Sequence, residues 1–409
     1  MPKRFLFLCI PDRGHAYPNL AVVAELVRRG HQVTYLTGPS LAEAVAATGA
    51  TLLPYETAYE KADVLHLATD EDPLALPILL AEESEAMIRA AEAHFGEDVP
   101  DLVAYDLATL HAGSILSRKW GRPAIRLSPV FASNEHFSAV QAMLEPDAEE
   151  VSAVPAGFEA LMGKIAGMLE AHGVAMTVEE FSTGIEDFNL VPLPREFQFA
   201  GETFDERFAF VGPCLGDRSF LGTWKEPDDG LPVVLASLGT VFNQQPDFFR
   251  SCVEAFTDVP VHVVMTLGDG CDPADLGPLP ANIEAHRWLP HRAVLEHARA
   301  FVTQGGMGSV VEALHAGCPM VAMPLAAVDR PTARRITELG LGQVLAPTDI
   351  TPERLRDTVL GLIADEDTAR RARTMRQHCL DAGGEVRAAE EIEQYLHRAG
   401  SGPGQKDTP

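Results

Sequence analysis

Short, continuous apolar runs alternate with longer amphipathic stretches along most of the chain. Apolar runs that do not alternate with polar residues are typical of parallel strands covered by helices on both faces. Glycines that end the amphipathic stretches, such as Gly30 and Gly49, are typical of helix C-caps. The pattern therefore predicts an α/β fold built on parallel sheets. The expected strands form two series, namely 5–10, 32–37, 102–106 and 124–128, then 233–239, 261–267, 283–288, 301–303 and 320–324.

Helices are expected in the gaps between these strands. A chain of 409 residues is too long for a single core, so we expect two domains. The segment 192–229 is rich in Pro, Gly and charged residues and is the predicted linker. We predict a first domain at 1–213, a second at 214–384, and at 385–409 a C-terminal helix that packs back on the first domain, followed by a disordered tail. The expected helices are 18–29, 40–48, 77–94 and 109–120, a less regular helical segment at 145–185, and three helical stretches after 351, the last at about 385–398.

The charge balance and the cysteines exclude several classes of protein. A formal net charge of -27 argues against binding to nucleic acid or to an anionic membrane. No uninterrupted apolar stretch approaches the ~20 residues needed to span a bilayer. The six cysteines lie far apart without a Cys-x-x-Cys pair, which indicates buried thiols in a reducing cytoplasm rather than disulfides or a zinc site. We therefore expect a cytoplasmic protein, for which a homodimer is the commonest oligomer.

A glycine-rich turn is the most informative local feature. The short apolar strand at 301–303 runs into this turn, which opens a helix and consists of Gln304, Gly305, Gly306, Met307, Gly308 and Ser309. Such a helix start directs unpaired N–H groups and the positive end of the helix dipole at one spot, where a diphosphate can bind. Glu312 is expected in the first helical turn, where its carboxylate could accept hydrogen bonds from ribose hydroxyls. The alternative is a strand–turn–helix unit without a ligand.

The residues around this turn form an extended motif, namely Trp288, Leu289 and Pro290, then Thr303, Gly305, Gly306, Ser309, Glu312, Ala313, Leu314, Gly317 and Pro319. The motif resembles the nucleotide-sugar signature of inverting glycosyltransferases of the macrolide-antibiotic and UDP-glycosyltransferase type. The resemblance implies the GT-B fold, in which two Rossmann-like, doubly wound α/β domains face a central cleft. It also implies transfer of a sugar from an NDP-sugar to a hydroxyl of a hydrophobic natural product, such as an antibiotic aglycone. We expect no metal ion and no cofactor besides the donor.

The loop after the first strand carries a histidine motif, Gly14-His15-Ala16-Tyr17-Pro18. It lacks Gly-x-Gly-x-x-Gly, which argues against a dehydrogenase, and it resembles the Gly-His-x-x-Pro motif whose His is the family's catalytic base. Asp106 ends a strand at the same sheet edge, where the family places an Asp that hydrogen-bonds the base. A histidine can take the proton of an attacking hydroxyl, and an aspartate can stabilise the resulting imidazolium. The alternatives are a structural histidine and an aspartate that only caps the next helix.

Several residues of the second series match the family's donor-binding positions. Trp288 and Leu289 correspond to residues that flank the nucleobase, although Trp288 could be core, and His291 replaces the usual Gln. Gln304 replaces the His that contacts phosphate, and its amide can donate a hydrogen bond but carries no charge. Leaving-group stabilisation would then rest on the backbone amides of 305–309 and on the helix dipole. The loop that approaches the diphosphate corresponds to Ser237, Leu238, Gly239 and Thr240.

The residues after Pro324 depart from the family pattern. Glucose-transferring relatives carry an acidic residue and a Gln that bind sugar hydroxyls, whereas the corresponding places here hold Val328 and Asp329. A valine suits a sugar that lacks a hydroxyl, because no polar group is then left unpaired. We therefore predict a deoxysugar donor, carried on dTDP rather than UDP, unless a local backbone shift returns Asp329 to the usual role.

The sequence does not identify the acceptor. The segments 55–81 and 128–185 are the expected acceptor walls, and their flexible apolar side chains suit either a large hydrophobic aglycone or plain core packing. Those side chains are Phe131, Phe137, Met143, Phe158, Met162 and Met168. Two other functions stay open, namely an NDP-sugar 2-epimerase of the same fold and a catalytically silent nucleotide-sugar-binding protein. Acceptor-dependent release of nucleoside diphosphate would distinguish a transferase from both.

Overall fold

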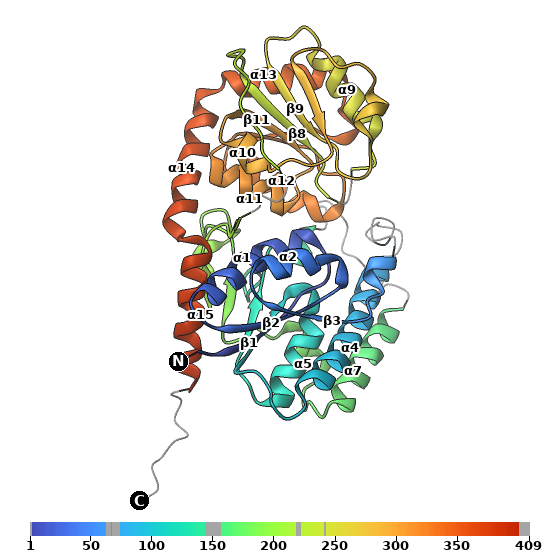
Figure 1. Cartoon of the computed structure of the whole chain (residues 1–409), viewed down its shortest axis with the longest axis vertical. Helices are drawn as coiled ribbons and strands as arrows, with labels where there is room; N and C mark the ends of the chain where they lie inside the picture. The colour runs from blue at the N-terminus through green and yellow to red at the C-terminus, as the bar shows by residue number, and fades with distance from the viewer. Residues whose placement is uncertain are drawn as a thin grey trace, which may run out of the picture.

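Two parallel sheets form the centre of the molecule, one above the other in Figure 1. The computed structural model describes residues 2–62, 67, 74–143, 157–217, 222–240 and 243–400. The first sheet has seven strands in the order β3-β2-β1-β4-β5-β6-β7, and the second has six in the order β10-β9-β8-β11-β12-β13. Neighbouring strands are parallel in both sheets. This is the parallel α/β arrangement that the apolar runs predict.

The strands and helices alternate along both halves of the chain. The first sheet contains β1 (Arg4–Leu8), β2 (Gln32–Thr37), β3 (Thr51–Pro54), β4 (Leu102–Asp106), β5 (Ala124–Leu127), β6 (Asn189–Val191) and β7 (Phe208–Phe210). The second contains β8 (Val233–Ser237), β9 (His262–Thr266), β10 (Ile283–His286), β11 (Ala298–Thr303), β12 (Met320–Ala322) and β13 (Gly342–Val344). The longer helices are α1 (Arg13–Arg28), α4 (Ala75–Phe95), α5 (Leu110–Trp120), α7 (Phe158–Ala171), α9 (Pro246–Phe256), α11 (Met307–Ala316), α12 (Arg330–Glu338), α13 (Pro352–Ala364), α14 (Glu366–Ala382) and α15 (Gly384–Gly400). The shorter ones are α2 (Ala42–Ala47), α6 (Ala139–Met143), α8 (Val178–Thr183) and α10 (His291–Leu295).

Helices cover both faces of the first sheet. Alternate residues of β1 point to opposite faces, so Phe5 and Phe7 pack in one apolar cluster while Leu6 and Leu8 pack in another. The first cluster includes residues of α1 and α15, and the second includes residues of α4, α5 and α7. Burial on both faces explains why these strands appear in the sequence as continuous apolar runs.

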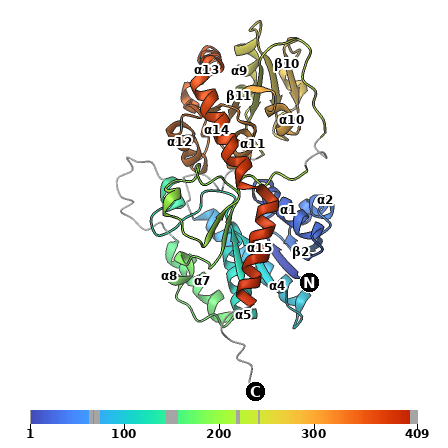
Figure 2. The same ribbon diagram turned by 90° about the vertical axis from the view of Figure 1, so that its left-hand side faces the viewer.

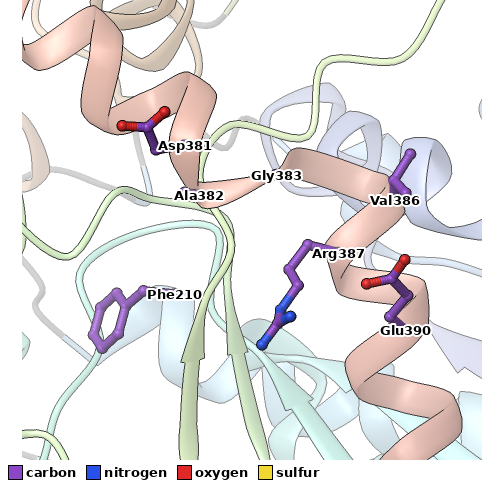
Figure 3. Close-up of a pocket in the computed structure, with 7 residues that line it drawn as sticks. All are labelled: Phe210, Asp381, Ala382, Gly383, Val386, Arg387 and Glu390. Carbon is purple, nitrogen blue, oxygen red and sulfur yellow. The ribbon is translucent and has the colours of Figure 1, made fainter.

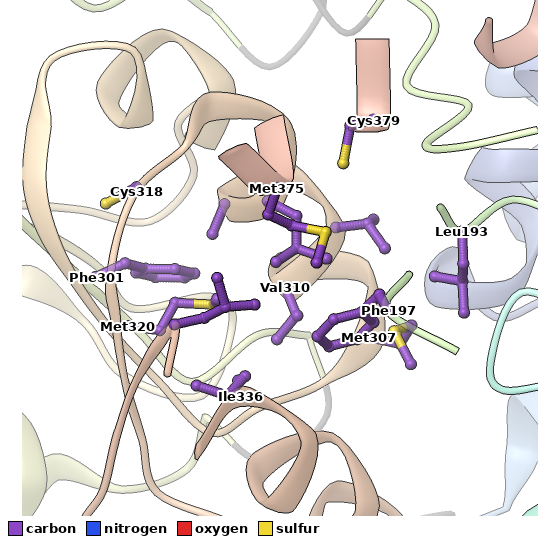
Figure 4. Packing of buried hydrophobic residues seen from close by; sticks show 14 of the residues in the cluster. Leu193, Phe197, Phe301, Met307, Val310, Cys318, Met320, Ile336, Met375 and Cys379 are labelled. Atoms are coloured by element: carbon purple, nitrogen blue, oxygen red, sulfur yellow. The ribbon is translucent and has the colours of Figure 1, made fainter. Parts of the chain in front are cut away.

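The second sheet is covered in the same way. Val234 and Val302 pack with α9 and α13 on one face, whereas Leu235 and Phe301 pack with α11 and α14 on the other. The cluster on the α11 face continues to Phe197, which comes from the segment between β6 and β7 (Figure 4). The two halves of the chain therefore share apolar packing.

Four short strands were missed by the sequence pattern, namely β3, β6, β7 and β13. Each has only three or four residues, and β3, β7 and β13 are edge strands. The predicted linker 192–229 was wrong in part, because it contains β7, a strand of the first sheet. The predicted tail at 401–409 and residues 144–156 of the predicted helical segment lie outside the described residues. The division into 1–213, 214–384 and 385–409 stays a prediction.

Two consecutive glycines join the last two helices. Gly383 and Gly384 have φ angles of 93° and 60°, which favour glycine; Gly383 caps the end of α14, and Gly384 is the first residue of α15. The break lets α14 pack on α11 and α15 pack on α1, so these helices run beside both halves of the molecule (Figure 2). A depression of about 410 Å³ at the break contains none of the candidate site residues (Figure 3). It is lined by Phe210, Asp381, Ala382, Gly383, Val386, Arg387 and Glu390.

All six cysteines are free and buried, as the sequence predicts. None of the described helices is long and apolar enough to cross a membrane. Within the part of the chain that the structure describes, no three His, Cys, Asp or Glu side chains gather closely enough to hold a metal ion.

Candidate active site

The candidate catalytic and donor-binding residues lie where the two halves of the chain meet. Helix α1 follows the carboxyl end of β1 in the first sheet, α11 follows the carboxyl end of β11 in the second, and these helices are in contact. Ligands of open α/β sheets bind outside the carboxyl ends of the strands. Side chains also meet here, since the guanidinium carbon of Arg13 lies 5.0 Å from the ring centroid of Trp288. The structure therefore brings the two groups of predicted site residues to one boundary.

His15 lies in the first turn of α1, which begins earlier than the predicted start at 18. Asp12 caps the helix, because its side chain accepts hydrogen bonds from the backbone N–H of Gly14 at 2.7 Å and of His15 at 3.3 Å. Tyr59, in the short 3-10 helix η2 (Tyr59–Lys61), donates its hydroxyl to Asp12 at 3.2 Å. The cap fixes where α1 begins and so where His15 is placed, with 28% of its side chain exposed.

Asp106 ends β4 and is fully buried. His15 Nδ1 lies 2.8 Å from Asp106 Oδ1, and the N–H of Ala108 donates to the same oxygen at 2.8 Å. The aspartate therefore caps the turn η3 (Leu107–Thr109) and also contacts the imidazole of His15. An ionised carboxylate only accepts hydrogen bonds, so Nδ1 carries a proton and the lone pair of the neutral ring lies on Nε2.

The ion pair controls the protonation of His15. Burial alone would lower the pKa of His15, but the charge and hydrogen bond of Asp106, with a smaller contribution from Asp12, outweigh it and raise this pKa to about 9. The imidazolium is therefore the resting form near neutral pH. Base catalysis by His15 must follow this titration, because only the neutral ring can accept a proton.

Trp288 follows β10 and is partly exposed. Its indole Nε1 donates to Asp269 at 3.0 Å, and Arg13 packs over its ring. The next residue, Leu289, is 7% exposed and belongs to an apolar cluster of the second sheet. The indole is thus not a core side chain, whereas Leu289 is core and can meet a ligand only through its backbone.

The glycine-rich turn has the geometry of an anion site. Gly305 has a φ of 93°, and its N–H donates to Thr303 Oγ1 at 3.2 Å. Gly306 is the N-cap of α11, which begins at Met307. N–H groups at the head of a helix lack intrahelical acceptors. The amides of Met307 and Gly308 therefore point out of the helix start, together with the positive end of its dipole.

Two details of this turn differ from the prediction. The N–H of Ser309 donates to the Gly306 carbonyl at 3.1 Å, so this amide and that of Gly305 are already used within the turn. Glu312 lies in the second turn of α11 rather than the first, is 6% exposed, and has its carboxylate 3.8 Å from His291 Nδ1. The prediction placed the helix start too late, because Met307, Gly308 and Ser309, taken as part of the turn, already belong to the first turn of α11.

Gln304 packs between two glycine turns. It is 7% exposed, and its Nε2 lies 3.2 Å from the place of a Cβ on Gly239 and 3.1 Å from that of a Cβ on Gly306. Its Oε1 is buried without a hydrogen-bond partner among the described residues. Gly239 has a φ of 71° and donates its N–H to Ser237 Oγ at 3.3 Å, and Thr240 follows as an exposed residue. The Ser237–Thr240 loop, Gln304 and the turn before α11 are therefore neighbours.

Val328 and Asp329 lie in the 3-10 helix η7 (Ala327–Asp329), beside the glycine-rich turn. The backbone oxygen of Asp329 is 3.7 Å from the place of a Cβ on Gly305. Val328 is 48% exposed, whereas Asp329 is 2% exposed and accepts a hydrogen bond from the N–H of Ala326 at 3.2 Å. Burial raises the pKa of Asp329 to about 7. The valine side chain therefore faces outward and the carboxyl group inward.

The predicted acceptor side chains contribute mainly to packing. Four of them lie in apolar clusters or aromatic groups, namely Phe131, Phe137, Met162 and Met168. Phe158 is 38% exposed, and Met143 is partly exposed. Core packing, one of the two interpretations of these residues, therefore applies to most of them.

Asp12, Arg13 and Asn19 belong to the site but were not among the predicted residues. Asp12 precedes a helix, a position where aspartate is a preferred N-cap. Asn19 lies four residues after His15 and so on the same helix face, and its Nδ2 is 3.4 Å from Asp106 Oδ2. Asp12 and Asn19 could therefore have been suggested by their local positions in the sequence. The contact of Arg13 with a ring from the other half of the chain has none.

Comparisons with known proteins place the chain in a family. Residues 250–392 match the family described as Erythromycin biosynthesis protein CIII-like, C-terminal domain. The chain is 40% identical over 403 residues to demethyllactenocin mycarosyltransferase of Streptomyces fradiae, covering 96% of this chain and 86% of that protein. It is 37% identical over 405 residues to NDP-glycosyltransferase YjiC of Bacillus licheniformis, covering 97% and 99%. The crystal structure of the calicheamicin glycosyltransferase CalG4 is similar with a TM-score of 0.87 and 42% identity, covering 98% of this chain and 99% of that one. The chain therefore belongs to the antibiotic NDP-glycosyltransferase family, and it is an NDP-glycosyltransferase with the GT-B fold.

Proposed function

We propose that the protein transfers a sugar from an NDP-sugar to a hydroxyl of a hydrophobic natural product, with inversion at the anomeric carbon. The acceptor oxygen bonds to this carbon as the bond to the diphosphate oxygen breaks. The hydroxyl proton passes to His15 Nε2, and the nucleoside diphosphate leaves with the bonding electrons. The observation that carries the proposal is the 2.8 Å contact between His15 Nδ1 and the carboxylate of the fully buried Asp106.

In this mechanism His15 is the general base and Asp106 orients it. The contact at Nδ1 leaves Nε2 to meet the acceptor, and the carboxylate charge stabilises the imidazolium that forms. Because the pKa of His15 is raised to about 9, the resting enzyme must release a proton before the acceptor is attacked. Turnover is therefore expected to rise with pH until about pH 9.

The donor diphosphate is proposed to bind at the start of α11. The head amides, the helix dipole and the amide N–H of Gln304 would hold its oxygens. The nucleobase would lie against the Trp288 ring and the Leu289 backbone, and the Glu312 carboxylate would meet the ribose. The proposed donor contacts are Ser237, Gly239, Thr240, Trp288, Leu289, Gln304, Gly305, Gly306, Met307, Gly308, Ser309 and Glu312.

The placement of the two groups supports inversion. His15 belongs to the first half of the chain and α11 to the second, and their helices meet at the boundary. A base on one side of the anomeric carbon and a diphosphate site on the other suit a single displacement, in which the attacking and leaving oxygens lie in line.

The sugar is proposed to be a deoxysugar carried on dTDP. Val328 faces outward beside the glycine-rich turn, whereas the Asp329 carboxyl is turned inward onto Ala326. An apolar side chain leaves no polar group unpaired next to a sugar carbon without a hydroxyl. The acceptor is proposed to be of the macrolide type, since the relative from Streptomyces fradiae is a demethyllactenocin mycarosyltransferase.

A panel of donors and acceptors tests the proposal. Purified protein is incubated with dTDP- and UDP-sugars, with and without a macrolide aglycone, and released nucleoside diphosphate and glycosylated product are measured. We expect acceptor-dependent release, fastest with a dTDP-deoxysugar, and a product whose anomeric configuration by NMR is opposite to that of the donor. UDP-glucose that reacts faster than every dTDP-deoxysugar would refute the donor assignment. A retained configuration would refute inversion, and a sugar altered without acceptor would indicate the epimerase alternative.

A further inference from the structure

Asn19 is a buried polar residue on a largely apolar helix face. It lies in α1, is 3% exposed, and is followed by the buried residues Leu20 and Ala21. Burying an amide is unfavourable unless the amide makes hydrogen bonds. The Nδ2 of Asn19 lies 3.4 Å from Asp106 Oδ2 and 3.8 Å from Cys9 Sγ. These contacts, rather than apolar packing, explain an asparagine at this position.

The carboxylate of Asp106 is contacted at both oxygens. His15 Nδ1 and the N–H of Ala108 each lie 2.8 Å from Oδ1, whereas Asn19 Nδ2 approaches Oδ2. His15 and Asn19 are four residues apart on α1, so they reach one carboxylate from the same helix face. The terminal torsion of an aspartate is broad, so a carboxylate held only at Oδ1 can turn and change the direction in which Oδ1 meets the imidazole. The contact at Oδ2 opposes that rotation.

We propose that Asn19 is a positioning residue that keeps the Asp106 carboxylate in the orientation in which its Oδ1 meets His15 Nδ1. This inference rests on the proposed function, in which His15 is the base. Asn19 touches neither substrate in this scheme and acts through the aspartate. When the Nδ2 donor of Asn19 is lost, the Asp106 carboxylate turns and its ion pair with His15 weakens. The ion pair then offsets the burial of His15 less completely, so the pKa of His15 falls.

The other titratable groups around the pair do not obscure this effect. Burial raises the pKa of three neighbours, which therefore stay neutral while His15 titrates, namely Cys9 after β1, Tyr35 in β2 and Tyr59 in η2. Asp12, in the turn before α1, contributes its charge to His15, and its hydrogen bonds with Gly14, His15 and Tyr59 do not involve Asn19. A change in the His15 titration of an Asn19 variant therefore reports on Asp106.

The test uses Asn19→Leu, which removes the donor while keeping the number of side-chain heavy atoms and the branch at Cγ. The titration of His15 is followed in the full-length protein by NMR of 13C-labelled histidine, with the signal assigned by its loss in His15→Ala. We expect the pKa of His15 to fall by about one pH unit or more. At about pH 10, where the ring is neutral in both proteins, we expect kcat to fall about tenfold and KM for donor and acceptor to change less than about twofold. Asn19→Ser, which is too short to reach Oδ2, is expected to behave alike and serves if the leucine variant does not fold.

Asn189→Leu is the matched control. Asn189 is 1% exposed in β6, and its Nδ2 donates to the backbone carbonyls of Glu186 and Arg207. Its loss is expected to lower Tm without moving the His15 titration, and the same result for Asn19→Leu would overturn the proposal. An upward shift of the His15 titration would overturn it too, because Asn19 would then compete with His15 for the carboxylate. NMR detects His15 without turnover, so this outcome is separate from failure of the proposed function, which would leave His15→Ala fully active.

Discussion

The two halves of the molecule contribute different chemistry to the same boundary. In the first half, the candidate site consists of side chains, with an imidazole and a buried carboxylate 2.8 Å apart. In the second half, the proposed site consists mainly of backbone, with Gly305 at a φ of 93°, the start of α11, and the neutral Gln304. Proton transfer requires a group whose charge changes, whereas fixed dipoles can hold a departing diphosphate. The comparison therefore suggests that the two halves will respond differently to substitution.

The largest expected effect comes from removing the charge in the first half. In Asp106→Asn the Asp106 charge no longer offsets the burial of His15, so we expect the pKa of His15 to fall from about 9 to below 6.5. At about pH 10, where the ring is neutral in both proteins, we expect kcat to fall about 10²–10⁴-fold because the imidazole is no longer oriented and the imidazolium no longer stabilised. The pH profile of kcat and calorimetric binding of nucleoside diphosphate measure this change, and the affinity should stay the same. Asp98→Asn, at an aspartate with 84% of its side chain exposed, is the control. Wild-type turnover in Asp106→Asn would contradict the proposal that Asp106 orients His15 for catalysis.

The same pair should make the stability of the protein depend on pH. The pKa of His15 is raised from 6.5 to about 9, so the pair stabilises the fold fully below pH 6.5, and this contribution is lost as pH rises through about 9. The contribution is at most about 3 kcal/mol. Urea unfolding of wild type and His15→Ala at about pH 6 and about pH 10 measures it. The difference in unfolding free energy between the two proteins should shrink at high pH, and a constant or growing difference would contradict the assignment.

A backbone change should affect the second half more than a side-chain change does. Alanine at Gly305 would adopt an unfavourable positive φ, while its Cβ would meet only ordinary contacts, the nearest at 3.7 Å from the Asp329 oxygen. We expect the Kd for nucleoside diphosphate to rise about tenfold. Gly30→Ala is the matched control, with a φ of 90° and nothing within 4 Å of the new Cβ, and should leave binding unchanged. Unaltered binding in Gly305→Ala would count against a diphosphate site at this turn.

The smallest expected effect comes from the side chain of Gln304. If backbone amides carry most of the leaving-group stabilisation, Gln304→Ala should lower kcat only about threefold. Gln304→His, which restores the residue of the family pattern, should raise kcat by a similar factor because an imidazole can carry a charge. A hundredfold loss in Gln304→Ala would show instead that a side chain dominates the second half as well.

Strands buried on both faces were the easiest part of the fold to predict. The predicted strands 32–37 and 102–106 agree with β2 and β4 residue for residue. β4 begins with a continuous apolar run, and β2 is rich in β-branched and aromatic residues. Strands β6 and β7 escaped prediction because three residues form no recognisable run, and their pairing depends on segments distant in sequence. The start of α11 was placed too late because Gly308, a poor helix former, lies in its first turn.

The candidate site was predictable where it follows from strand ends. Asp106 and the loop of His15 follow neighbouring parallel strands, so their approach could be expected from the sequence. Asn19 was not found, although its spacing of four residues from His15 places both on one helix face; which atoms it reaches depends on how α1 packs against the sheet. The inward orientation of Asp329 likewise depends on one short turn, and the residue pattern does not specify that geometry.

The central claim is that one half of the molecule takes the proton and the other holds the diphosphate. The most direct test measures turnover and nucleoside diphosphate affinity in the same preparation of His15→Ala, with the exposed His94→Ala as control. The account predicts that kcat falls about 10²–10⁴-fold while the Kd changes less than about twofold. Full turnover in His15→Ala, or nucleotide affinity that is lost together with turnover, would contradict it.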